Sequence, residues 1–183
     1  MKKFLFGVFI SVFFISCTDK AEEKPTTTET SASTEVKKTG DELLPASEGD
    51  MIRTSLAAFT KGDIEGFTAN YDDNARLLWS SGDSLVGKKA IQDYYKGRWK
   101  LIDSLSYSDH VIVPLRMAVE QTQYAPLGKW ILVWSFAHVK YKNGKKLDFW
   151  VHTANHVNDA GKVDLAAQYI DRHPIMEATK GMK

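Results

Sequence analysis

Residues 55–79 read SLAAFTKGDIEGFTANYDDNARLLW, and this segment carries the pattern that decides the fold. Apolar residues recur at helical spacing up to Gly62, where we expect a first helix to end. Asp63 is a suitable N-cap for a short second helix. The Asp-Asp-Asn cluster at residues 72–74 predicts a turn, and residues 75–79 predict a strand. The segment therefore indicates two helices followed by the first strand of a sheet.

The flanking sequence extends this pattern in both directions. Ser47 and Asp50 resemble a capping box at the start of the first helix, and residues 88–102 predict a third amphipathic helix. Turn signals at residues 143–144 and 159–161 separate segments rich in β-branched and aromatic residues. These segments predict strands at residues 107–119, 130–141, 147–157 and 163–170. The expected fold class is α+β, with three N-terminal helices packed on a curved, mainly antiparallel sheet.

Three stretches together resemble a known superfamily: residues 55–79, GKKAIQDYY at 87–95 and NDAGKVDLAAQYID at 158–171. They are similar to the nuclear transport factor two-like superfamily, which includes the SnoaL-like polyketide cyclases and the ketosteroid isomerases. The resemblance covers roughly residues 48–175 and implies a cystatin-like cone whose interior holds ligands. It does not define an activity, because this fold hosts enzymes and non-catalytic binders alike.

The resemblance to the ketosteroid isomerases fails at their catalytic groups. Their proton-transferring aspartate corresponds to Trp79 or Leu78, and their oxyanion tyrosine corresponds to Ser55. Their protonated aspartate corresponds to Thr153, and only Tyr95 matches a supporting tyrosine. An isomerase needs a carboxylate base and donors for the enolate oxygen, so we predict no catalytic residue at these positions.

The resemblance instead implies an apolar pocket inside the cone, and one polar group within it. We expect Gln168 to point into the pocket, where its amide would orient either a ligand or a neighbour such as Tyr95 or Thr153. Strand alternation separates Trp130, Trp134, Phe136 and His138 from Val133, Ser135 and Val139, although the register stays open. The candidate ligand-binding residues are Trp79, Tyr95, Trp99, Phe136, His138, Thr153, Gln168 and Ile170.

The histidines do not predict a metal site. His152 and His156 lie four residues apart in an expected strand, a span of about 13 Å, so they cannot both bind one zinc ion. His110, His138 and His173 are scattered and are interpreted as structural. We expect no metal and no cofactor. Asp171 and Arg172, at the end of the last strand, are interpreted as a solvated pair rather than as part of a site.

Three functions remain open from the sequence. The first is a module that binds a small, mostly apolar molecule in the cone. The second is a SnoaL-like acid–base enzyme of the cyclase, isomerase or dehydratase class, acting on a small carbonyl compound through His138, His152 or Asp171. The third is an interaction domain that forms a homodimer through its sheet and fills the cone with its own tryptophans. A titratable group aimed into an open cavity would favour the enzyme, and an open cavity without one would favour the binder.

The N-terminus predicts a bacterial lipoprotein. Lys2 and Lys3 precede an apolar run at residues 4–15, which is too short to span a bilayer and is typical of a signal peptide. Residues 14–17, FISC, resemble a lipobox. The resemblance implies cleavage after residue 16 and acylation of Cys17, which would anchor the chain to a lipid bilayer.

We therefore expect a signal peptide at residues 1–16, a lipidated cysteine and disordered tether at 17–40, and the globular domain at 41–183. The tether is rich in Thr, Ser, Glu and Lys and contains no aromatic residue. Residue 18 is a threonine, whereas an aspartate at this position would resemble the inner-membrane retention signal of some Gram-negative bacteria. This favours the outer membrane of a Gram-negative bacterium, facing the periplasm or the cell surface. Removing the signal leaves 22 basic and 23 acidic residues, a charge that does not attract nucleic acid.

The lipoprotein assignment is tested by replacing the cysteine. In a Cys17→Ser variant we expect the domain to leave the membrane fraction or to remain as an unprocessed precursor, because no acyl chain can be attached. Fractionation and the mass of the N-terminal peptide measure this. A variant that is cleaved after residue 16 and still sediments with membranes as the parent does would contradict the assignment.

Overall fold

The computed structural model describes residues 40–119 and 125–182, so the expected signal peptide, Cys17 and the tether before Gly40 lie outside the described residues. Within them, one sheet of seven strands has the order β1-β4-β5-β6-β7-β2-β3. The strands are β1 (Glu42–Leu43), β2 (Tyr71–Trp79), β3 (Ser84–Val86), β4 (Ile102–Met117), β5 (Gly128–Tyr141), β6 (Lys146–Val157) and β7 (Val163–Tyr169). The helices are the 3₁₀ helix η1 (Ala46–Gly49), α1 (Asp50–Phe59), α2 (Ile64–Phe67), α3 (Lys88–Trp99) and α4 (His173–Thr179).

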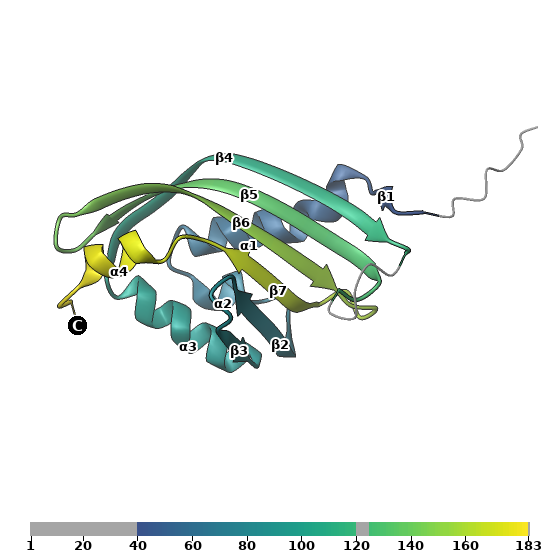
Figure 1. Cartoon of the computed structure of the whole chain (residues 1–183), viewed down its shortest axis with the longest axis horizontal. Coiled ribbons are helices and arrows are strands. Elements are labelled where there is room, and N and C mark those ends of the chain that lie inside the picture. Colours follow the sequence, from purple (N-terminus) through teal and green to yellow (C-terminus); the bar gives the residue numbers. More distant parts are fainter. Residues whose placement is uncertain (1–39, 120–124, 183) are drawn as a thin grey trace, which may run out of the picture. The chain divides into compact units, whose positions relative to one another are not determined.

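The sheet is strongly curved, and α1, α2 and α3 lie on its concave side (Figure 1). Neighbouring strands pair antiparallel except β2 and β7, which pair parallel. The predicted α+β class, with helices against a curved and mainly antiparallel sheet, is confirmed. The curvature leaves space between the helices and the sheet, and that space contains the cavities described below.

The turns that the sequence indicated are built as expected. Gly144 and Gly161 have φ angles of 86° and 71° in the loops that join β5 to β6 and β6 to β7. A left-handed backbone favours glycine, so these two positions define the hairpins. Asp63 caps α2 as predicted, because its side chain accepts a hydrogen bond of 2.8 Å from the backbone of Gly66.

Several local predictions are wrong. Ser47 does not cap the first helix: it lies within η1, and α1 begins at Asp50 without a side-chain cap. Residues 72–74 form part of β2 rather than a turn. The amide of Asn74 donates to the Asp72 carboxylate at 2.9 Å, and the pairing with β7 shifts register there, so the polar cluster is accommodated in a bulge.

The limits of some elements also differ from the expectation. The third helix ends at Trp99, and β4 begins at Ile102 rather than at residue 107. The sequence did not indicate β1, β3 or α4. These elements are short, with two, three and seven residues, and such lengths carry too few periods for a pattern.

Two apolar clusters hold the helices against the sheet. The larger joins α1, α2 and α3 to β2, β5 and β7 around Ile64, Leu77, Ile91 and Ile131, which are almost fully buried. The smaller lies at the other end of the sheet, where Ile175 and Ala178 of α4 pack against β4 and β5. Residues of both clusters line the cavities described below.

Two glycine substitutions in helices are expected to change the free energy of unfolding in opposite directions. A Cβ on Gly66 would overlap the capping Asp63 carboxylate, whereas a Cβ on Gly97 in α3 meets nothing within 4 Å. We expect Gly66→Ala to lower the free energy of unfolding by about 0.5–2 kcal/mol through loss of the cap. Gly97→Ala should raise it by about 0.5–1 kcal/mol through helix propensity. Thermal unfolding measures both, and shifts of the same sign would contradict the assignments.

Candidate functional site

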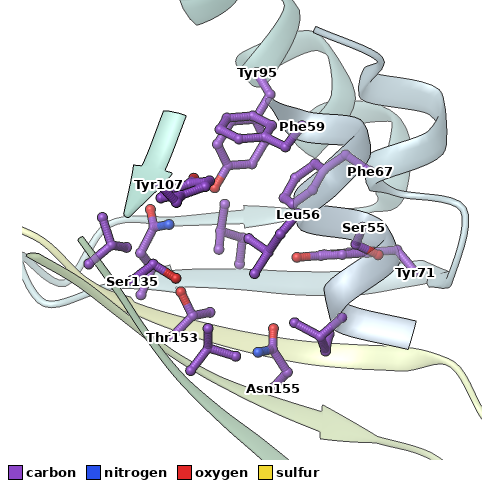
Figure 2. Close-up of a pocket in the computed structure, with 15 residues that line it drawn as sticks. Ser55, Leu56, Phe59, Phe67, Tyr71, Tyr95, Tyr107, Ser135, Thr153 and Asn155 are labelled. Carbon is purple, nitrogen blue, oxygen red and sulfur yellow. The ribbon is translucent and has the colours of Figure 1, made fainter. Parts of the chain in front are cut away.

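The first cavity, which we call the inner chamber, lies between α1 and α2 and the centre of the sheet (Figure 2). Its volume is about 60 Å³, and on that scale a single water needs about 10–15 Å³. The helices contribute an apolar wall that includes Leu56, Phe59 and Phe67. The sheet contributes a polar wall: Ser135 comes from β5, and Thr153 and Asn155 come from β6. The chamber is therefore apolar on one side and polar on the other.

Hydrogen bonds fix much of the polar wall. The amide of Asn155 donates to the carbonyl of Ile131 at 3.1 Å. The hydroxyl of Ser135 lies 2.8 Å from Nδ1 of His110. His110 belongs to β4 and does not line the chamber. Burial, followed in size by the charge of Arg53, lowers the pKa of His110. The imidazole is therefore biased toward its neutral form, which can accept a proton or a hydrogen bond from Ser135.

The second cavity, which we call the outer chamber, lies nearer α4 and has a volume of about 160 Å³. An engineered cavity of about 150 Å³ in another protein accommodates benzene, so the outer chamber has room for a ring-sized group. Its floor includes Ala137, Val139 and Phe149 of β5 and β6. Ile175 and Met176 of α4 close one side, and the chamber is mostly apolar.

The two chambers share a wall made by Phe59, Tyr95, Tyr107, Val151 and Gln168. Within it, Oε1 of Gln168 accepts a hydrogen bond of 3.1 Å from the indole N–H of Trp79. Gln168 also lies beside the hydroxyl of Tyr95, and this contact opposes the rise that burial causes in the pKa of Tyr95. The ring of Tyr95 packs edge-on against Phe59. One amide thus organises the wall between the chambers.

The tyrosines of the chambers act as hydroxyl groups rather than as phenolates. Burial raises the pKa of Tyr95, Tyr107 and Tyr71, so each side chain stays protonated near neutral pH. Among the residues that the structure describes, the lining of both chambers includes no aspartate, glutamate or histidine. The interior therefore offers hydrogen-bond donors and acceptors more readily than a strong base.

Most of the sequence-based candidates lie at these chambers. Thr153 lines the inner chamber, Trp79 and Ile170 line the outer one, and Tyr95 and Gln168 lie between them. Their contact with a ligand remains a prediction.

Trp99 lines neither chamber. It packs in the core against Phe59, with ring centroids 5.9 Å apart, and it also faces Gly62.

Two other candidates were placed wrongly. Phe136 and His138 lie on the convex face of the sheet, because the residues that alternate with them, Ser135, Ala137 and Val139, point into the chambers. On that face, Nδ1 of His138 pairs with Asp148 at 2.8 Å. The expected alternation of β5 was correct, and the assignment of these two side chains to the cone was not.

The residues suggested for acid–base chemistry also lie away from the chambers. His138 lies on the convex face, where the ring of His152 stacks between Trp134 and Tyr169 with centroid distances of 4.5 and 5.6 Å. Asp171 is exposed and accepts a hydrogen bond from the backbone of the following helix. None of the three lines a chamber.

Sequence reasoning missed two arginines and three tyrosines of the outer chamber, which are Arg98, Arg172, Tyr94, Tyr107 and Tyr141. Arg98 follows Tyr94 by four residues, so helical spacing places both on one face, and this signal was available. Tyr107 lies in a strand whose register was open. Arg172 does not form the expected solvated pair with Asp171: its Nη1 donates to Asp83 at 2.9 Å, which is a contact between distant parts of the chain.

Residues 52–165 match the family of SnoaL-like domains. The chain belongs to this family. No curated protein matches the chain significantly. In this SnoaL-like domain the positions of Ser55, Trp79 and Thr153, which resemble catalytic positions of the ketosteroid isomerases, do line the chambers. These positions therefore lie at the cavities, and their side chains differ from the catalytic groups of the isomerases; their role in a ligand site stays a prediction.

Solved structures show the same fold at low sequence identity. A protein of Xanthomonas campestris described as a polyketide cyclase is 13% identical, with a TM-score of 0.56 over 71% of this chain and 94% of that one. A Bacillus subtilis protein described as an isomerase is 18% identical, with a TM-score of 0.51 over 73% and 96%. An epoxide hydrolase of M. tuberculosis is 13% identical, with a TM-score of 0.51 over 71% and 86%. At such identities the likeness concerns the fold alone.

The described residues add two observations on other kinds of site. No group of three or more His, Cys, Asp or Glu side chains among them is arranged to hold a metal ion. Within residues 40–119 and 125–182, no helix is both long and apolar enough to cross a membrane.

Gln168 is the chamber residue whose substitution we expect to lower the free energy of unfolding most. A Gln168→Leu substitution leaves the Trp79 indole and the Tyr95 hydroxyl without this partner inside the wall. The free energy of unfolding of the empty protein should fall by about 1–3 kcal/mol. Thermal or urea unfolding measures it. In a Trp79→Phe background the same substitution should cost less, and an equal cost in both backgrounds would refute the coupling.

Proposed function

We propose that this protein is a membrane-anchored lipoprotein whose SnoaL-like domain binds a small, mostly apolar molecule in the two chambers, without catalysis. The observation that carries the proposal is the chamber lining, which combines aromatic walls with a few hydroxyl and amide groups. Ligand sites are typically apolar cavities with a small number of oriented polar groups. Cys17 would hold the domain at the outer membrane, so that the ligand is captured beside a bilayer.

One observation favours the runner-up function, an acid–base enzyme. Ser135 faces the inner chamber and contacts His110, a serine–histidine pair of the kind used in nucleophilic catalysis. The Ser135 side chain is only 3% exposed, and the chamber around it has room for only a few waters. A substrate would have to open this chamber before reaching the hydroxyl. Binding in the larger outer chamber requires no such change.

The third function, a homodimeric interaction domain, is favoured less. Its tryptophans were expected to fill the cone, whereas Trp79 forms a wall of the outer chamber and leaves the chamber open. The convex face does expose Trp150 and Tyr169 at 54% and 53%. A homodimer through this face remains a proposal that is compatible with ligand binding on the concave side.

Binding is tested with an uncharged probe, 4-phenylbutan-1-ol, which carries one ring and one hydroxyl. The protein is the mature chain, residues 17–183, with Cys17→Ser to avoid lipid and detergent. We expect saturable binding in calorimetry and a rise in melting temperature, because a ligand that binds only the folded state stabilises it. Absence of saturable binding would contradict the proposal.

Cavity-filling variants locate the binding. Val151→Phe fills space that both chambers share, and Ile170→Phe fills the outer chamber, so each should weaken binding at least tenfold while the chain still unfolds cooperatively. Ala160→Phe adds the same ring in an exposed turn and should bind as the parent does. Equal affinities in all three variants would place the probe elsewhere.

A further inference from the structure

The charges of the outer chamber are of one sign. Arg98 and Arg172 both line it, and among the described lining residues there is no acidic side chain. The remaining polar groups are hydroxyls, which include those of Tyr94 and Tyr141, and the amide of Gln168. Two guanidinium groups therefore stand at the wall of a mostly apolar cavity, and the charge of Arg172 is partly balanced by Asp83, which lies outside the lining.

Contacts within the protein hold Arg172 in this position. Its guanidinium carbon lies 4.9 Å from the ring centroid of Trp79, a cation–π arrangement, and its Nη1 donates to Asp83 at 2.9 Å. The side chain is one-third exposed, so the group stands between the chamber and the solvent. A guanidinium has five N–H donors in a planar fork, and the bond to Asp83 involves only one of its nitrogens.

Arg98 approaches the same chamber from α3. Its charge lies close to the hydroxyl of Tyr141 at the end of β5 and opposes the rise that burial causes in the pKa of Tyr141. The side chain is half-buried, and Tyr94, one helical turn earlier, lines the chamber beside it. Trp79 and Asp83 therefore pre-position Arg172, so the binding of an anion there would cost little side-chain entropy.

We propose that the outer chamber binds a monocarboxylate with a ring-sized apolar body, whose carboxylate is held by Arg98 and Arg172. This inference rests on the proposed function and names the class of its ligand. The planar fork of arginine matches a carboxylate, and a charge-assisted pair is about twice as strong as a neutral hydrogen bond. The apolar body lies toward the wall of Tyr95 and Gln168, and the volume of about 160 Å³ suits a single ring.

A simpler explanation is that both arginines serve only the fold. Asp83 accounts for the position of Arg172, and Tyr141 accounts for that of Arg98. In that case the chamber would not distinguish an acid from a neutral molecule of the same shape. The two explanations therefore differ in one measurable quantity, the ratio of the two affinities.

The test compares 4-phenylbutanoate with 4-phenylbutan-1-ol on the mature Cys17→Ser chain, by calorimetry at pH 7 and low salt. We expect the acid to bind at least about tenfold more tightly than the alcohol, as one charge-assisted contact would give. In Arg98→Gln and in Arg172→Gln that ratio should approach one, with the affinity for the alcohol within about twofold of the parent. Arg172→Lys keeps the charge and should keep most of the ratio. If Arg172→Gln does not fold, the test depends on Arg98→Gln.

Arg76→Gln is the matched control, because Arg76 is an exposed arginine on β2 that lines neither chamber. It should keep the full ratio. If the alcohol binds and the acid binds no more tightly, the carboxylate proposal is overturned and the proposed function stands. The carboxylate proposal is also overturned if Arg76→Gln lowers the ratio as much as Arg98→Gln does. If neither compound binds, both proposals fall.

Discussion

The hydrogen bond from the indole of Trp79 to Gln168 joins two strands that are far apart in the chain. Trp79 and Gln168 are directly paired in the parallel register of β2 and β7, and the same amide reaches the hydroxyl of Tyr95 on α3. An amide in an apolar interior must keep its partners, since an unpaired polar group there costs about 1–3 kcal/mol. The bond therefore fixes β2 and β7 at one point beside Tyr95 of α3, and Gln168 lies in the wall between the two chambers.

This arrangement gives the two chambers different properties. The inner chamber is small, and its polar wall is largely occupied by bonds such as those of Ser135 and Asn155. The outer chamber is larger and has arginines where it approaches the solvent. Arg172 and the apolar Met176 both line the chamber and are partly exposed, so charged and apolar groups lie side by side at its solvent side. An apolar cavity with charged groups at its wall suits a molecule that has one polar end.

Much of the fold was predictable because residues 55–79 and the later strands carry clear periodicity, and Asp63, Gly144 and Gly161 supply the expected local chemistry. The bulge at residues 72–74 could not be predicted, because these polar residues also favour a turn and the sequence does not show the partner strand. For the site, the family resemblance placed Gln168 toward the cone, and its side chain lines both chambers. Phe136 and His138 were misassigned because alternation separates the two faces of β5 without saying which face is turned toward the helices. The contact of Arg172 with Asp83 joins residues 89 apart in sequence and leaves no local signal.

The chain has five tryptophans, and their indole N–H resonances report on different surfaces. Trp79 donates its N–H within the wall of the outer chamber, whereas Trp150 is exposed on the convex face. The most direct test of ligand binding inside the cone is a ¹⁵N spectrum of these resonances while 4-phenylbutan-1-ol is added to the mature Cys17→Ser chain. The Trp79 resonance should shift with a saturating dependence on concentration while that of Trp150 stays in place. A shift of Trp150 with no change at Trp79 would contradict the account.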